Sequence, residues 1–160
     1  FVIAGAPARS KEYYDPFLTS DNVHLILNDT YNLLNNSHSA LVTSGTATLE
    51  TALFKVPQVV CYKSSAFSYR IAKILIGNRI KFISLVNLII GEEIVTELIQ
   101  SELTEFNLTK ELGVVVSTEG RGKMLKEYKL LEEKCGGTGA SYNTANGMLK
   151  TLEELKRNKR

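Results

Sequence analysis

The sequence predicts an α/β fold: a Rossmann-like parallel sheet with helices on both faces, followed by a C-terminal helical tail. Over residues 1 to about 85, short apolar strand-like runs alternate with helix-like segments, the pattern of a parallel sheet covered on both sides. From about Glu92 onward the apolar spacing becomes helical, and we expect no further strand. The length of 160 residues and the hydrophobic content of 44% suffice for a globular core. We therefore divide the chain into a sheet domain, residues 1–116, and a tail, residues 117–160.

The first part of the chain contains two strand and helix pairs. We predict strands at Phe1–Ala4 and Val23–Leu27 and helices at Arg9–Leu18 and Tyr31–Asn36. Because the chain begins without Met and inside a predicted strand, we expect it to be a piece of a longer protein.

The most informative run follows the next predicted strand, Ser39–Thr43. Ser44, Gly45 and Thr46 form a predicted turn, and a helix then runs from about Ala47 until Pro57 stops it. The free backbone N–H groups and the positive dipole end of such a helix favour a phosphate or diphosphate. A glycine lets the ligand approach the backbone, and the hydroxyl of Thr46 or Thr48 can add a hydrogen bond.

Glu50 lies one turn further into this helix. A capping box would pair it with a Ser or Thr at position 47, where the chain has Ala, so its carboxylate is available to ribose hydroxyls. The alternative is that Ser44 only caps the helix and that Glu50 is a solvated acid. The run by itself leaves both interpretations open.

The remaining elements alternate once more and then become helical. We predict a strand at Gln58–Tyr62, a helix at Ser65–Ile76 and a strand at Lys81–Leu85. In the tail, Val114–Val116 is expected to end a helix, Cys135–Gly139 to be a linker, and residues from Ala140 to Leu155 to form the last helix.

Positive charge is concentrated between residues 51 and 91, a segment with six Lys or Arg residues and no Asp or Glu. Its predicted helix, Ser65–Ile76, carries Phe67 on an apolar face, with Arg70 and Lys73 elsewhere. Such a helix suits an anionic membrane surface. The alternative is an ordinary helix that buries this face against the sheet. The aromatic and basic residues do not alternate as in RNA-binding proteins, so nucleic acid is not expected as a partner.

Composition excludes several other classes. No apolar run reaches the roughly 20 residues of a membrane-spanning helix. Cys61 and Cys135 have neither metal-ligand nor redox spacing, and we expect two free thiols in a reducing cytoplasm. No cluster of His, Cys, Asp and Glu suggests a metal site.

Four ordered runs, Ser44–Glu50, Val56–Lys63, Ile83–Ile89 and Glu93–Gln100, resemble those of the lipid-A-disaccharide synthase family. The resemblance covers essentially the whole chain and corresponds to the C-terminal, donor-binding half of these enzymes. It implies the C-terminal domain of a GT-B glycosyltransferase that binds UDP-2,3-diacylglucosamine. The sugar would be transferred with inversion to lipid X, 2,3-diacylglucosamine 1-phosphate, which gives the lipid A disaccharide and UDP.

The resemblance also implies roles for single residues. Ser44, Gly45 and Thr46 would hold the diphosphate, Glu50 the ribose hydroxyls, and Asn87 and Glu97 the cleft edge. Fixed hydrogen-bond donors at the diphosphate stabilise the departing UDP, so neither a metal nor another cofactor is required. The family's catalytic carboxylate lies in the N-terminal half, so no catalytic residue is assigned here and this chain alone should be inactive.

The chain departs from the family pattern in two places. The family usually has Leu-Pro-Asn where this chain has Leu85, Val86 and Asn87, and Gly-Arg-Glu where it has Gly91, Glu92 and Glu93. The second change replaces a cation near the cleft with an acid, so the role of that arginine is not assigned to any residue.

As further implications, we expect a cytoplasmic protein, peripheral on the inner membrane of a Gram-negative bacterium. The last helix would cross to the N-terminal half in a GT-B enzyme, and here it would hang free or pack on a second copy of the chain. Two alternatives remain open: another UDP-sugar transferase or epimerase of the GT-B architecture, and a non-catalytic nucleotide-binding module that docks on a separate catalytic subunit.

Overall fold

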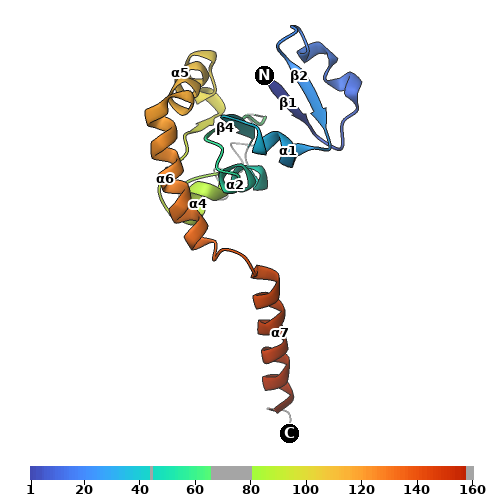
Figure 1. Cartoon of the computed structure of the whole chain (residues 1–160), viewed down its shortest axis with the longest axis vertical. Helices are drawn as coiled ribbons and strands as arrows, with labels where there is room; N and C mark the ends of the chain where they lie inside the picture. Colours follow the sequence, from blue (N-terminus) through green and yellow to red (C-terminus); the bar gives the residue numbers. More distant parts are fainter. Residues whose placement is uncertain (44, 66–80, 158–160) are drawn as a thin grey trace.

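The structure, a computed structural model, describes residues 1–43, 45–65 and 81–157. Figure 1 shows an α/β body from which one long helix extends. The strands are β1 (Val2–Gly5), β2 (His24–Leu27), β3 (Ala40–Thr43), β4 (Gln58–Tyr62) and β5 (Glu97–Ile99). The α-helices are α1 (Thr30–Asn35), α2 (Thr46–Leu53), α4 (Leu85–Ile90), α5 (Glu105–Val116), α6 (Thr118–Lys134) and α7 (Ala140–Arg157). Short 3-10 helices lie at Lys11–Tyr13, Asp15–Phe17 and Gln100–Glu102.

All strand pairs are parallel, as expected for this fold class, but they lie in two sheets rather than one. β1 pairs with β2, and the second sheet has the order β3-β4-β5. β4 is central, and its Val59 and Val60 are completely buried. Helices flank these sheets, so the structure confirms the predicted Rossmann-like α/β class.

The core forms where α2, α4, α5 and α6 pack around β4. α6 supplies Met124, Tyr128 and Leu131 to this cluster, and the side chain of Leu131 is fully buried. Lys134, at the end of α6, donates a hydrogen bond of 2.8 Å to the carbonyl of Ile90, the last residue of α4. Such a contact satisfies a carbonyl that a helix end leaves without an internal partner.

Three of the predicted elements differ in the structure. The helix predicted at Arg9–Leu18 is two 3-10 turns, the second with a proline at its start. The strand predicted at Lys81–Leu85 is wrong, because Ser84 accepts a hydrogen bond from the Asn87 N–H and begins α4. The prediction that no strand follows Glu92 is also wrong, because β5 pairs with β4 from Val60↔Glu97 to Tyr62↔Ile99.

The last helix, α7, extends away from the body in Figure 1. It has no buried residue, and its Tyr142, Met148 and Leu152 are more than half exposed. It follows the predicted linker, in which Gly136, Gly137 and Gly139 all have positive φ. No helix among the described residues is both long and apolar enough to cross a membrane.

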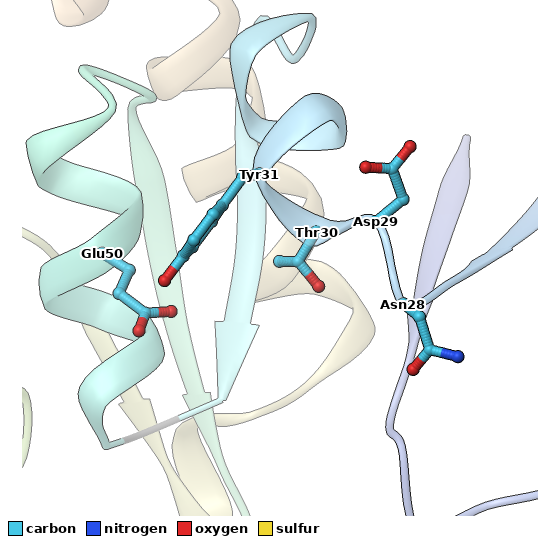
Figure 2. Close-up of a pocket in the computed structure, with 5 residues that line it drawn as sticks. All are labelled: Asn28, Asp29, Thr30, Tyr31 and Glu50. Carbon is cyan, nitrogen blue, oxygen red and sulfur yellow. The ribbon is translucent and has the colours of Figure 1, made fainter.

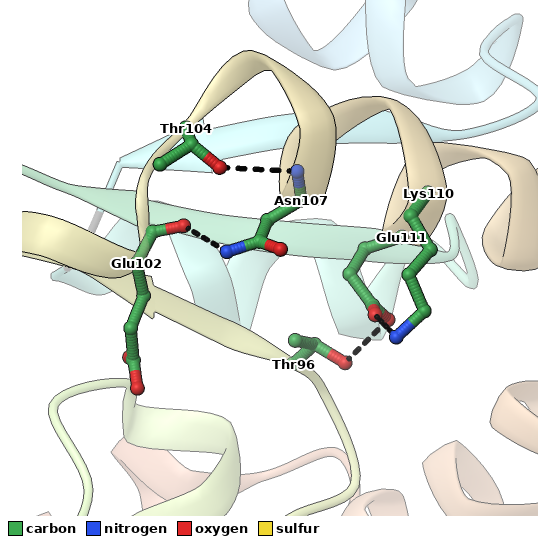
Figure 3. A network of polar contacts seen from close by, with 6 residues as sticks. All are labelled: Thr96, Glu102, Thr104, Asn107, Lys110 and Glu111. Carbon is green, nitrogen blue, oxygen red and sulfur yellow. Dashed lines mark hydrogen bonds and ion pairs between the residues drawn. The ribbon is translucent and has the colours of Figure 1, made fainter.

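Figure 3 shows the polar contacts at the start of α5. Thr104 caps this helix by accepting a hydrogen bond of 3.2 Å from the Asn107 backbone N–H, and the Asn107 side chain donates to the Glu102 carbonyl at 2.8 Å. We expect Thr104→Ala to lower the free energy of unfolding by about 1 kcal/mol, the usual cost of losing such a cap. Urea denaturation measures the change. Thr109→Ala, an exposed position inside the same helix, is the control and should stay within about 0.5 kcal/mol of wild type.

Candidate functional site

The described part of the junction between β3 and α2 is Gly45, at the start of the helix. Gly45 stands at the N-cap of α2 with φ 117° and ψ −158°, a conformation open to glycine and few other residues, and it has no side chain with which to cap the helix. Among the described residues, apart from its two chain neighbours, nothing lies within 4 Å of the position where a Cβ on Gly45 would point. Thr46 beside it is exposed. Ser44 lies outside the described residues.

Of the two hydroxyls predicted to reach a phosphate, only that of Thr46 is exposed. Thr48 is completely buried, and its Oγ1 donates a hydrogen bond of 2.7 Å to the Gly45 carbonyl. Of the two alternatives, Thr46 or Thr48, the structure leaves Thr46. A separation of two residues on a helix corresponds to a rotation of about 200°, so Thr46 faces solvent while Thr48 faces the core.

Glu50 is half-buried in α2 and lines a pocket of about 400 Å³. The other lining residues are Asn28 and Asp29, from the turn after β2, and Thr30 and Tyr31, from the start of α1. Figure 2 shows the Tyr31 ring and the Glu50 carboxylate at one end of this pocket, with Asn28 at the other.

The aromatic wall of this pocket is held by a second ring. Tyr31 stacks on Phe54, which follows α2, with 5.3 Å between the ring centroids and 23° between the ring planes. Asn28 has a left-handed φ of 56°, which places its side chain on the turn rather than in the strand direction. Sequence reasoning did not select these residues as site residues. The turn signal Asn28-Asp29 after an apolar strand was the available clue.

Asn87 and Glu97, the two residues predicted at the cleft edge, are hydrogen-bonded to each other in the structure. The Asn87 amide donates to the Val95 carbonyl and to Glu97 Oε1, both at 2.8 Å, and its oxygen accepts from the N–H groups of Ile94 and Val95. Its four hydrogen-bonding positions are therefore all used within the protein.

The Glu97 carboxylate is the centre of this network. Its Oε1 accepts from the Ser84 N–H at 3.0 Å and from the Ser84 hydroxyl at 2.7 Å, and its Oε2 accepts from the Ile83 N–H at 2.8 Å. Glu97 also borders a second pocket of about 460 Å³ together with Lys81, Thr96 and Glu111. The network fixes the segment before α4 against β5. Contact of Asn87 or Glu97 with a substrate stays a prediction.

The remaining predicted residues are the membrane-facing candidates and the two cysteines. Phe67, Arg70 and Lys73, the membrane-facing candidates, lie outside the described residues. Cys61 and Cys135 are both free thiols, as predicted, and partial burial raises the pKa of the Cys61 thiol. Among the described residues, no group of three or more His, Cys, Asp and Glu side chains could hold a metal ion.

Comparison with known proteins gives consistent matches. A family model described as lipid-A-disaccharide synthetase matches residues 10–145. The lipid-A-disaccharide synthase of Syntrophus aciditrophicus is 38% identical over 77% of this chain and 32% of its own length. Those of Pseudoalteromonas translucida and Solibacter usitatus are 41% and 31% identical over 70% and 95% of this chain, and over 29% and 40% of their own lengths. The chain thus spans about a third of the length of these relatives.

Proposed function

Because the chain belongs to the lipid-A-disaccharide synthase family, which consists of glycosyltransferases, we propose that it is the donor-binding part of such an enzyme. The whole enzyme transfers 2,3-diacylglucosamine from its UDP derivative to lipid X and releases UDP. The observation that supports this role most directly is the open start of α2 at Gly45, one helical turn from the pocket that Glu50 lines.

In this proposal the diphosphate binds at Ser44, Gly45 and Thr46, where helix N–H groups and the helix dipole favour negative charge. Glu50 lies four positions after Thr46, a rise of about 6 Å along the helix. That length matches the step from a diphosphate to the ribose hydroxyls of the same nucleotide. The Glu50 carboxylate accepts hydrogen bonds from those hydroxyls, and the base occupies the part of the pocket beside the Tyr31 ring (Figure 2).

The chemistry asked of these residues is stabilisation of a leaving group. When the sugar is transferred with inversion, UDP gains negative charge as the glycosidic bond breaks. Donors already fixed at the diphosphate bind that charge more strongly in the transition state than in the ground state, and no metal or other cofactor is needed. Asn87 and Glu97 then shape the cleft edge through the backbone segments that they hold together.

We assign catalysis and acceptor binding to other parts of the enzyme. We assign no catalytic residue here and expect the catalytic carboxylate and the acceptor site in the N-terminal half of the enzyme, so this chain alone should be inactive. A diacylated donor requires a cytoplasmic enzyme at the inner-membrane surface, and Phe67, Arg70 and Lys73 are the candidates for contact with anionic lipid. The exposed apolar side chains of α7 are available to the N-terminal half or to a second copy of the chain.

The test is a calorimetric titration of the chain with UDP, beside Glu50→Ala. We expect the substitution to weaken binding by about 1–3 kcal/mol, the cost of losing a charged hydrogen-bond acceptor. Glu119→Ala, which removes an exposed acid from the first turn of α6, is the control and should bind UDP as the wild type does. Equal affinities of the Glu50 and Glu119 variants would contradict the assigned role of Glu50. Absence of UDP binding by the wild-type chain would contradict a donor site formed by this part alone.

A further inference from the structure

A buried polar side chain is hydrogen-bonded to the first turn of α2, the helix that begins at the proposed site. Gln58 begins β4 and is completely buried. Its Nε2 donates a hydrogen bond of 2.9 Å to the Thr48 carbonyl in α2 and one of 3.2 Å to the Tyr128 hydroxyl in α6. That hydroxyl in turn donates to the Val56 carbonyl at 3.3 Å. Gln58 therefore joins α2, β4 and α6 through a single amide group.

The chain of hydrogen bonds continues from Thr48 to the turn. Both the hydroxyl and the backbone N–H of Thr48 donate to the Gly45 carbonyl, at 2.7 and 3.2 Å. These two bonds point the Gly45 carbonyl into the helix. Because the peptide group is planar and trans, the N–H of Thr46 points in the opposite direction from that carbonyl. The N–H is thereby aimed out of the N-terminal end of α2, where a helix leaves its first N–H groups without internal partners.

We propose that Gln58, itself held by Tyr128, is a positioning residue for the donor-binding turn. This inference rests on the proposed function and extends it into the core. Gln58 fixes the Thr48 carbonyl, Thr48 fixes the Gly45 carbonyl, and the peptide plane fixes the direction of the N–H that meets the diphosphate. A hydrogen-bond donor that is fixed in advance binds developing charge without reorganisation. We call this series of contacts, from Gln58 through Thr48 and Gly45 to the Thr46 N–H, the relay, and it therefore has a consequence for function.

The unpaired atom of Gln58 distinguishes this role from ordinary core packing. Among the described residues, Gln58 Oε1 is a buried acceptor without a hydrogen-bond partner. Such an atom costs stability, whereas a methionine of similar length would fill the same space without it. The amide is therefore unfavourable for packing alone, and its directed bond to Thr48 is the gain that remains.

The experiment uses the whole chain and measures three quantities: amide hydrogen exchange by mass spectrometry, UDP affinity by calorimetry, and the urea midpoint of unfolding. We expect Gln58→Met and Thr48→Val to speed exchange in the segment 46–49 about tenfold at Thr48, whose N–H donates to the Gly45 carbonyl. Both should also weaken UDP binding about tenfold, which corresponds to one hydrogen bond. Exchange in α6 should not change. Thr48→Ser, which keeps the hydroxyl, should retain wild-type exchange and affinity.

The control is Val115→Ala, which removes buried volume from α5 in the same core. It should lower the urea midpoint and leave UDP affinity unchanged. Unchanged exchange at residues 46–49 in both Gln58→Met and Thr48→Val, or a loss of UDP affinity in Val115→Ala equal to theirs, would overturn the proposal. If Gln58→Met does not fold, the comparison of Thr48→Val with Thr48→Ser still tests the proposal.

The outcome also separates this proposal from the proposed function. Faster exchange at residues 46–49 in a chain that binds no UDP would support the relay and contradict the donor site. Faster exchange with UDP affinity unchanged would support the donor site and overturn the positioning role.

Discussion

Replacement of Glu97 by alanine is expected to lower the free energy of unfolding by about 3–5 kcal/mol, because it leaves several buried hydrogen-bond donors without an acceptor, each at a cost of about 1–3 kcal/mol. The carboxylate is only 9% exposed and accepts hydrogen bonds from two backbone N–H groups, a hydroxyl and the Asn87 amide. Without it, the N–H groups of Ile83 and Ser84 lose their partner on the buried side of the segment. The start of α4 and its contact with β5 are weakened together.

Urea denaturation measures this loss, and two further variants show its origin. Glu93→Ala removes an exposed carboxylate four residues earlier and should change stability by no more than about 0.5 kcal/mol. Glu97→Gln keeps one carbonyl oxygen as an acceptor but turns an NH₂ group toward another donor, so its loss should lie between those of Glu93→Ala and Glu97→Ala. A Glu97→Ala variant as stable as Glu93→Ala would contradict a structural role for this network.

Gly45→Val is expected to abolish detectable UDP binding, a loss of at least roughly 100-fold or about 3 kcal/mol in affinity. The added side chain would occupy the open space through which the diphosphate approaches the helix start. A residue with a Cβ also strains at φ 117° and ψ −158°, which should lower the free energy of unfolding by about 1–3 kcal/mol. The loss of UDP affinity should therefore be larger than the loss of folding stability can explain.

Calorimetry with UDP and urea denaturation of the same preparation separate the two effects. Gly113→Ala is the matched control, since this glycine lies inside α5, has no positive φ and has nothing within 4 Å of the position that an alanine methyl group would take. It should leave UDP affinity unchanged and raise stability slightly through better helix propensity. Retention of wild-type affinity by Gly45→Val would remove the turn from the donor site.

The turn and the helix that follows it were predictable because local chemistry determines both. Only glycine adopts the conformation at position 45 easily, and Pro57 ends the region available to the helix. The Ile83 region was not predictable in the same way, because its apolar run is typical of a strand. In the structure, the N–H groups of Ile83 and Ser84 are satisfied by a side chain 13 or 14 residues away instead of by a neighbouring strand.

The strand β5 was missed for a related reason. It is only three residues long and begins with an acid, and its leucine fits the helical spacing of the residues around it. Its burial against β4 depends on tertiary contact, which propensity does not report. Asn28 and Tyr31 line one pocket with Glu50 only because the fold brings the start of α1 beside α2. Local sequence patterns do not report such a tertiary contact, so these neighbours of Glu50 were not predicted.

The exposed helix α7 affects how every stability measurement on this chain must be read. An 18-residue helix with no buried side chain has little tertiary support, and isolated helices of that length are marginal in water. Its circular dichroism signal should fade at lower urea than that of the body, so one unfolding curve would contain two transitions. Hydrogen exchange at the buried β4 amides of Val59 and Val60 reports the body alone, and the urea midpoints of the variants should be taken from such a probe.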